Sequence, residues 1–196
     1  MTDKSTGYEA VAAEFIAGRG RAPATGIGAR EVRAWARALP ASSSVLDLGC
    51  GTGLPITREL IEAGLDVHAV DGSPSFVAAF RRNFPDVPVE CESVLESTYF
   101  NRQFDAVIAW GLVFLLFPAE QRQLINRMSN AIVAGGRLLF TSPPRPQVWI
   151  DAMTAVESRS LGAEEYRAIC ASAGVVVARE YEDVGENHYY ESIKPA

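Results

Sequence analysis

The chain has 196 residues, a formal net charge of -6 and a sequence pI near 5.0. Its 48% hydrophobic and 21% charged residues are typical of a globular protein and argue against disorder. Because the chain is acidic and has no Lys/Arg block to track phosphates, we expect no nucleic-acid partner.

Short apolar segments alternate with helical patterns through most of the chain. Helices should begin near Pro55, Pro74 and Pro118, because proline fits the first turn of a helix. Gly135 and Gly136 should close the third of these helices. The apolar, β-prone runs around the helices predict five strands, at 45–48, 67–70, 87–91, 104–110 and 137–141.

The pattern changes toward the C-terminus. A helix is predicted at 163–173, followed by strands at 175–181 and 187–193. Two strands joined by so short a turn must be antiparallel, since a parallel return needs a long crossover. We therefore predict an α/β fold: a parallel sheet with helices on both sides that ends in a hairpin.

Cysteine and histidine are too sparse for a structural metal site, so we expect no metal. The longest apolar run, 112–118, is far shorter than the ~20 residues that cross a bilayer. No apolar signal core follows the first residues. We therefore expect a cytoplasmic protein without a membrane partner.

The main chemical signal is the turn after the first strand, Asp47-Leu-Gly-Cys-Gly-Thr-Gly53. Its glycines, Gly49, Gly51 and Gly53, permit positive φ and let a ligand lie against the backbone. Asp71 ends the next strand, where a carboxylate can accept hydrogen bonds from ribose hydroxyls. Ligands of open α/β sheets bind at the carboxyl ends of the strands, so these residues predict a nucleoside site.

The glycine spacing argues against two common cofactors. A dinucleotide fingerprint needs a third glycine at a position that Leu54 or Ile56 occupies here, which disfavours an NAD-dependent oxidoreductase. A Walker-type phosphate loop needs Gly-Lys-Ser/Thr, and the sequence lacks it. The turn therefore suits a nucleoside ligand without a pyrophosphate.

The glycine turn resembles the first motif of class I S-adenosylmethionine-dependent methyltransferases, and Asp71 resembles their ribose-binding acid. The resemblance runs from about Tyr8 to the C-terminus. It implies a Rossmann-like, doubly wound, three-layer αβα fold whose seven-stranded, mostly parallel sheet has an antiparallel last strand. It also implies S-adenosylmethionine as cofactor and S-adenosylhomocysteine as product. One methyltransferase domain would cover 1–196, with an N-terminal helical lid (1–40), a cofactor-binding core (41–145) and C-terminal helices with a β-hairpin (146–196).

The resemblance also implies roles for the residues of the turn. Gly49, Gly51 and Gly53 would flank the methionine part of the cofactor, and Asp47 would hold its amino group through water. Cys50, inside the turn, is interpreted as a small packing residue and not as a nucleophile.

Residues after the second and third strands would face the adenosine. Gly72 and Ser73 would lie beside it, and Glu92-Ser93 would face the adenine edge. Members of this family usually have an Asp-Ala or similar pair after the third strand, so Glu92 departs from the pattern.

Three other regions contribute candidates. Trp110 and Gly111 end the fourth strand near the reactive sulfonium, where Trp110 either favours the cation through its π face or belongs to the core. Tyr8 and Arg19 are similar to a lid helix that closes over the cofactor carboxylate, although Arg19 fits an ordinary amphipathic helix equally well. His188 could act as a general base, or it could be structural.

Three functions remain open. The first is a methyltransferase that moves a methyl group to the O, N, S or C atom of a small-molecule acceptor by in-line displacement. The second is a non-catalytic protein that binds the same cofactor, and the third, less favoured, is an NAD-dependent oxidoreductase. Methyl transfer depends on proximity and alignment and requires no particular side chain, so the sequence does not separate the first two. The apolar run 111–117 favours a hydrophobic or aromatic acceptor.

Overall fold

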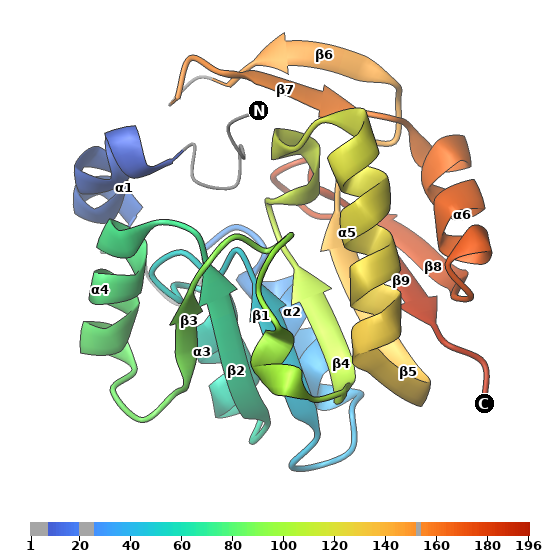
Figure 1. Ribbon diagram of the computed structural model, residues 1–196, viewed down its shortest axis with the longest axis horizontal. Coiled ribbons are helices and arrows are strands. Elements are labelled where there is room, and N and C mark those ends of the chain that lie inside the picture. Colours follow the sequence, from blue (N-terminus) through green and yellow to red (C-terminus); the bar gives the residue numbers. More distant parts are fainter. Residues whose placement is uncertain (1–7, 20–25, 152–153) are drawn as a thin grey trace.

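A computed structural model describes residues 8–19, 26–151 and 154–196 (Figure 1). The α-helices are α1 (Ala12–Arg19), α2 (Ala29–Arg37), α3 (Ile56–Glu62), α4 (Pro74–Asn83), α5 (Pro118–Ala131) and α6 (Ala163–Ser172). The 3-10 turns are η2 (Glu9–Val11), η3 (Tyr99–Asn101) and η4 (Val113–Leu115). The strands are β1 (Ser44–Leu48), β2 (Asp66–Asp71), β3 (Val89–Cys91), β4 (Phe104–Ala109), β5 (Ile132–Thr141), β6 (Gln147–Ile150), β7 (Glu157–Ser160), β8 (Val176–Glu182) and β9 (His188–Ile193).

Seven strands form one sheet in the order β3-β2-β1-β4-β5-β9-β8. The first five strands pair in parallel. The last strand, β9, is antiparallel to both of its neighbours, β5 and β8. The predicted fold is therefore confirmed, with the C-terminal hairpin turned inward so that β9 lies between β5 and β8.

Helices cover both faces of this sheet (Figure 1). The strand β1 shows why, because all five of its residues are buried and successive side chains point to opposite faces. Val45 packs into a core cluster with α2 and α3, whereas Leu46 and Leu48 pack into a second cluster with α5 and α6. The helix α4 packs on the same face as α2 and α3, through Phe80 against Ala69.

One predicted helix end is wrong. The helix α5 ends at Ala131, and Ile132 already begins β5, so Gly135 and Gly136 lie inside the strand and do not close the helix. The pairing of β4 with β5 shifts register here, and a Cβ on Gly136 would lie 2.8 Å from the carbonyl oxygen of Val133. Gly136 therefore lies at a bulge where backbone carbonyl oxygens leave no room for a side chain, and Gly135 supplies the positive φ of 77° beside it.

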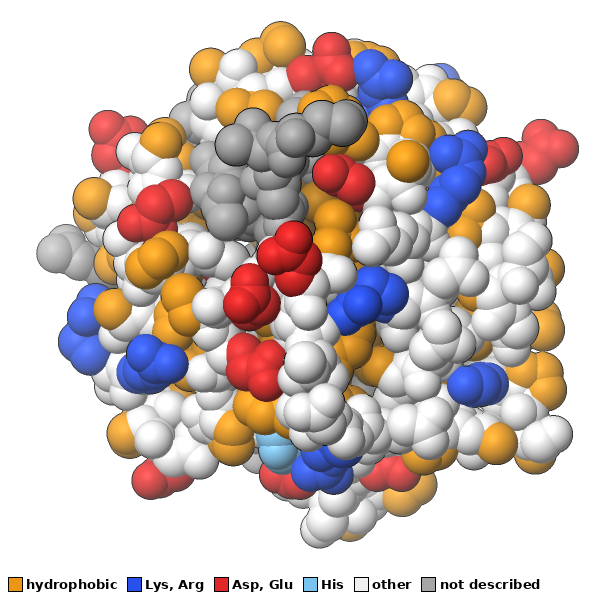
Figure 2. All heavy atoms as spheres, in the orientation of Figure 1, with side chains coloured by type: hydrophobic (Ala, Val, Ile, Leu, Met, Phe, Trp, Pro, Cys, Tyr) orange, Lys and Arg blue, Asp and Glu red, His pale blue; other side chains and the backbone are white. Residues whose placement is uncertain are grey.

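A second, two-stranded antiparallel sheet was not predicted. It pairs β6 with β7 and lies beyond the carboxyl ends of the parallel strands, at the top of Figure 1. Among the described residues, no helix is both long and apolar enough to cross a membrane. On the face drawn in Figure 2, Lys and Arg side chains are scattered and do not gather in one patch.

Candidate functional site

The glycine turn between β1 and α3 opens onto a cavity of about 500 Å³. Gly49, Gly51 and Gly53 all have positive φ, at 70°, 57° and 79°. A Cβ added at Gly51 would meet nothing within 4 Å, whereas one added at Gly53 would lie 2.3 Å from a ring carbon of Phe84. Gly51 therefore faces the open space, and Gly53 allows close packing beneath the turn.

Asp71, at the end of β2, closes one side of the turn. Its carboxylate is 6% exposed and accepts hydrogen bonds from the backbone N–H of Gly51 and of Ser73, both at 2.8 Å. Burial raises the pKa of Asp71 to about 6, although the two N–H donors oppose this shift. A positively charged or hydroxyl-bearing ligand would stabilise the ionised carboxylate.

Asp47, in β1, lies at the base of the same cavity and is 1% exposed. Its Oδ2 accepts a hydrogen bond from Thr57 Oγ1 at 2.6 Å. Burial raises the pKa of Asp47 to about 7, and the negative charge of Asp71 adds to this shift. The hydroxyl of Thr52, which also lines the cavity, is buried without a hydrogen-bond partner among the described residues.

The charges around the cavity all have one sign. Three carboxylates line it, from Asp47, Asp71 and Asp151, and none of the described lining residues is Lys, Arg or His. The described residues that line the cavity are Tyr8, Phe15, Gly26, Ile27, Asp47, Gly49, Cys50, Gly51, Thr52, Leu54, Pro55, Ile56, Asp71, Gly72, Phe76, Val94, Trp110, Gly111, Leu112, Phe114, Leu115, Asp151, Gly185 and Asn187. Such a site favours a ligand with positive charge or with hydrogen-bond donors.

Trp110 and Gly111 line the cavity at the end of β4. The indole Nε1 of Trp110 donates a hydrogen bond to Tyr189 Oη at 2.9 Å. A Cβ on Gly28, which precedes α2, would lie 2.7 Å from the indole ring, so Trp110 is held by close packing as well. The backbone N–H of Gly111 donates to Thr141 Oγ1 at 2.8 Å. Trp110 is therefore both a packed residue and part of the cavity wall.

The N-terminal segment contributes two of the aromatic side chains that line the cavity. The rings of Tyr8 and Phe15 lie against Phe76 of α4, with centroids 6.4 and 5.1 Å away. Glu9 fastens this segment, because its carboxylate accepts hydrogen bonds from the Ser73 hydroxyl and, at 2.6 Å, from the Ser75 hydroxyl. Figure 1 shows α1 lying beside the start of α4.

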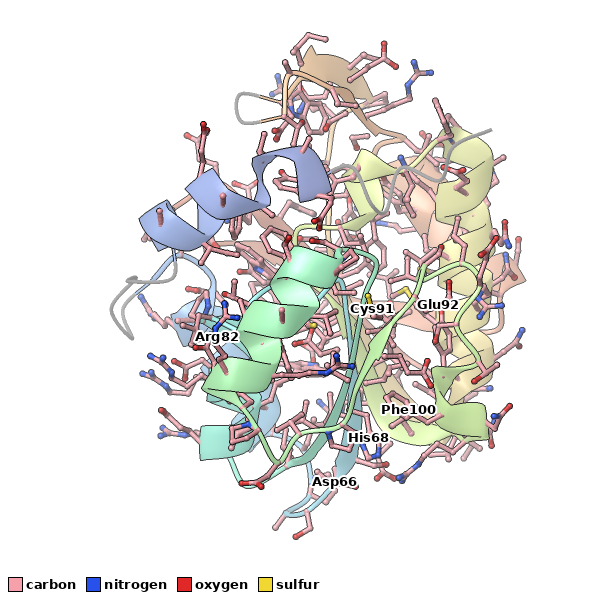
Figure 3. All side chains as sticks on the ribbon, turned by 60° about the vertical axis from the view of Figure 1, so that its left-hand side comes forward. Asp66, His68, Arg82, Cys91, Glu92 and Phe100 are labelled. Carbon is pink, nitrogen blue, oxygen red and sulfur yellow. The ribbon has the colours of Figure 1, made fainter. Side chains whose placement is uncertain are left out.

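Several predicted site residues lie outside the cavity lining. Ser73 is the N-cap of α4, with its hydroxyl accepting from Phe76 N. Glu92 is exposed at the end of β3, where Figure 3 shows it beside Cys91, and Ser93 is buried and accepts from Leu95 N. The neighbouring Val94 lines the cavity instead.

The remaining two predictions concern His188 and Arg19. The ring of His188 contacts two carboxylates of the neighbouring strand β8, Glu180 Oε2 at 3.0 Å and Glu182 Oε1 at 3.3 Å. His188 does not line the cavity. Arg19 ends α1, and its side chain lies outside the described part of the structure. Within the described residues, no group of three or more His, Cys, Asp or Glu side chains could hold a metal ion.

The sequence did not single out some residues of the cavity. Phe114 and Leu115 come from η4, Asp151 follows β6, and Gly185 and Asn187 belong to the β8–β9 loop. For Phe114 and Leu115, the apolar run 111–117 was a sequence signal, since it favoured a hydrophobic acceptor. The other three depend on contacts between segments far apart in the chain, such as the 3.2 Å hydrogen bond from Tyr8 Oη to Asp151 Oδ2.

Known proteins match the part of the chain that holds the glycine turn, Asp71 and Trp110. Residues 45–136 match the family described as "Methyltransferase domain". Over 107 residues, the chain is 33% identical to carboxy-S-adenosyl-L-methionine synthase of Erwinia tasmaniensis. This alignment covers 50% of this chain and 43% of that protein. The chain spans less than half the length of the curated relatives it matches.

Solved structures match over nearly the whole chain. The CcbJ methyltransferase of Streptomyces caelestis superposes with a TM-score of 0.79 at 17% identity and covers 100% of both chains. Magnesium protoporphyrin IX methyltransferase of Synechocystis, solved with bound S-adenosylmethionine, gives a TM-score of 0.74 at 16% identity, over 99% of this chain and 98% of that one. At these identities, the likeness shows that the fold is shared.

Proposed function

We propose that this chain, whose residues 45–136 match a methyltransferase domain and whose fold is that of class I methyltransferases, binds S-adenosylmethionine and transfers its methyl group to a small molecule. The observation that carries the proposal is the open space at Gly51. It lies between two buried carboxylates, those of Asp47 and Asp71, at the carboxyl edge of a parallel sheet.

The residues of this cradle fit the cofactor. Each oxygen of Asp71 accepts one backbone N–H and keeps a lone pair that can accept a ribose hydroxyl. Asp47 has one oxygen engaged by Thr57 and would bind the amino group with the other. Gly51 would let the ligand lie against the backbone, because no side chain fills that space.

The charge of the cavity also favours this cofactor over a dinucleotide. Burial of Asp47 and Asp71 raises the pKa of both carboxyls, so a ligand with a sulfonium and an ammonium group would stabilise their ionised forms. A pyrophosphate would bring two further negative charges to a cavity whose described lining contains no Lys, Arg or His.

When bound, the cofactor supplies an electrophilic methyl group, and the protein supplies alignment and exclusion of water. The aromatic cluster of Tyr8, Phe15 and Phe76 would shield the cofactor from water. Trp110, held by Tyr189 and Gly28, would form the wall at the end of β4 where the acceptor enters.

A product assay tests the proposal and separates it from non-catalytic binding. The protein is incubated with S-adenosylmethionine and a small-molecule extract, and mass spectrometry follows S-adenosylhomocysteine and any compound that gains one methyl group. We expect both products, and neither with the Gly51→Val variant. If the cofactor binds and no acceptor gains a methyl group, the protein is a binding protein and not a methyltransferase.

A further inference from the structure

One wall of the cavity is the loop between β8 and β9, which is built around the buried carboxylate of Asp183. This side chain is 9% exposed. Its Oδ1 accepts hydrogen bonds from the backbone N–H of Gly185 at 2.8 Å and of Asn187 at 3.0 Å. Its Oδ2 accepts from Tyr189 Oη at 2.8 Å. The loop therefore has a defined shape, although Val184 at its tip is 90% exposed.

The same carboxylate orients the amide of Asn187, which lines the cavity. Asn187 Nδ2 donates to both oxygens of Asp183, at 3.1 and 2.9 Å. A carboxylate only accepts hydrogen bonds, so the amide cannot turn its oxygen toward it. Asn187 Oδ1 is therefore the amide atom left for a ligand, and it accepts no hydrogen bond from the described residues.

A hydrogen-bonded chain ties this loop to the end of β4. Trp110 Nε1 donates to Tyr189 Oη, which in turn donates to Asp183. The ring of Tyr189 also stacks on Tyr181 of β8, with centroids 4.8 Å apart and planes at 6°. The orientation of Asn187 is thereby fixed relative to Trp110, on the wall where the proposed function places the acceptor.

The neighbouring part of the cavity is apolar. Phe114 and Leu115 line it, and Phe114 packs on Trp149 of β6 with centroids 5.5 Å apart. Ile27 lies against the loop so closely that a Cβ on Gly185 would come within 2.6 Å of it. A carboxylate or phosphate on the acceptor would meet aromatic rings and an amide oxygen, with no basic side chain among the described lining residues.

We propose that Asn187 selects the methyl acceptor: its Oδ1 accepts a hydrogen bond from a hydroxyl or N–H group of an apolar, ring-bearing molecule that carries no carboxylate or phosphate. Asp183 is a positioning residue that keeps the Asn187 oxygen turned toward the cavity. This inference rests on the proposed function, since the acceptor is defined only if the other half of the cavity holds the cofactor.

The test uses aromatic compounds in matched triplets that differ only in one group: hydroxyl, methyl ether or carboxylate. Binding of each compound to protein saturated with S-adenosylhomocysteine is measured by calorimetry. We expect the hydroxyl compounds to bind about tenfold tighter than the ethers and carboxylates, because a polar site rejects analogues that leave its acceptor unpaired.

Two variants separate selection from a structural role. Asn187→Leu should reduce the hydroxyl preference to about threefold or less, since it removes the acceptor oxygen and keeps a similar volume. Asp183→Asn should let the Asn187 amide turn over, so that the ethers gain affinity relative to the hydroxyls. Asn126→Leu, which changes an exposed amide on α5, is the matched control and should leave all ratios unchanged.

Four results would overturn the inference: a wild-type preference for carboxylates, no binding of the hydroxyl compounds, a preference that survives in Asn187→Leu, or ratios that Asp183→Asn does not move. These results leave the proposed function in place as long as S-adenosylhomocysteine binds. Failure of S-adenosylhomocysteine itself to bind would refute the proposed function instead.

Discussion

Replacing Gly51 by alanine separates the cost of backbone strain from the cost of filling the cradle. At φ 57°, a Cβ strains the backbone by about 1 kcal/mol, yet it meets no protein atom within 4 Å. For a chain of this length, we expect the melting temperature to fall by about 2–4 °C. The added methyl group would occupy space that the cofactor needs. If this overpacking costs about 2 kcal/mol of binding free energy, the affinity for the cofactor falls roughly 30-fold.

The matched control is Gly64→Ala. Gly64 follows α3, has φ 79° and would also meet no atom within 4 Å, but it does not line the cavity. The melting temperature of the Gly64→Ala variant should fall by as much as that of Gly51→Ala. Its affinity for S-adenosylhomocysteine, measured by calorimetry, should stay at the wild-type value. If Gly51→Ala binds as tightly as Gly64→Ala, the ligand does not lie against this turn and the reasoning is refuted.

Three further predictions concern packing, charge and hydrogen bonding. Gly53→Ala should lose about 3 kcal/mol of unfolding free energy in urea, because its Cβ would lie 2.3 Å from Phe84; a loss no larger than that of Gly64→Ala would contradict this. The pKa of Asp47, raised to about 7 in the folded state, makes folding less favourable as the pH rises from about 4 to 7, since the unfolded chain ionises first. Relative to wild type, Asp47→Asn should therefore gain about 2 kcal/mol of stability between about pH 5 and pH 7.5, and a difference that does not depend on pH would argue against the buried, protonated carboxyl. Tyr189→Phe should cost about 2 kcal/mol in the same urea assay, because it leaves the indole N–H of Trp110 without its acceptor; a change below about 0.5 kcal/mol would show that the hydroxyl bond is not needed.

The sheet was predictable because its signals are local. The strand 45–48, the glycine turn and the proline-started helices each depend on neighbouring residues, and the structure has them within one or two positions. The end of α5 was misjudged for the same reason. A glycine pair predicts a helix end from its neighbours alone, whereas the bulge at Gly136 depends on the register of β5 against β4.

The sequence predicted best the part of the cavity that lies around the glycine turn. Gly51 and Asp71 are close to one another because Gly51 follows β1 and Asp71 ends β2, its parallel neighbour, an order of elements that the sequence predicts. By contrast, Trp110 and Tyr189 meet across 79 positions, and no local pattern reports such a contact.

His188 illustrates a second limit. The sequence placed the start of its strand at the correct edge of the sheet but did not say which face each side chain takes. Tyr189 packs with the α2–α3 cluster, and Tyr190 packs on the opposite face, beside His188. The residue that reaches the cavity is Asn187, one position before the strand.

The central claim is that the glycine cradle binds S-adenosylmethionine. Calorimetric titration of the purified protein with S-adenosylmethionine, S-adenosylhomocysteine and NAD tests it most directly. We expect both sulfur nucleosides to bind with micromolar affinity, NAD not to bind, and Asp71→Ala to abolish the binding. If neither sulfur nucleoside binds, the claim is wrong, and binding of NAD alone would instead support an oxidoreductase.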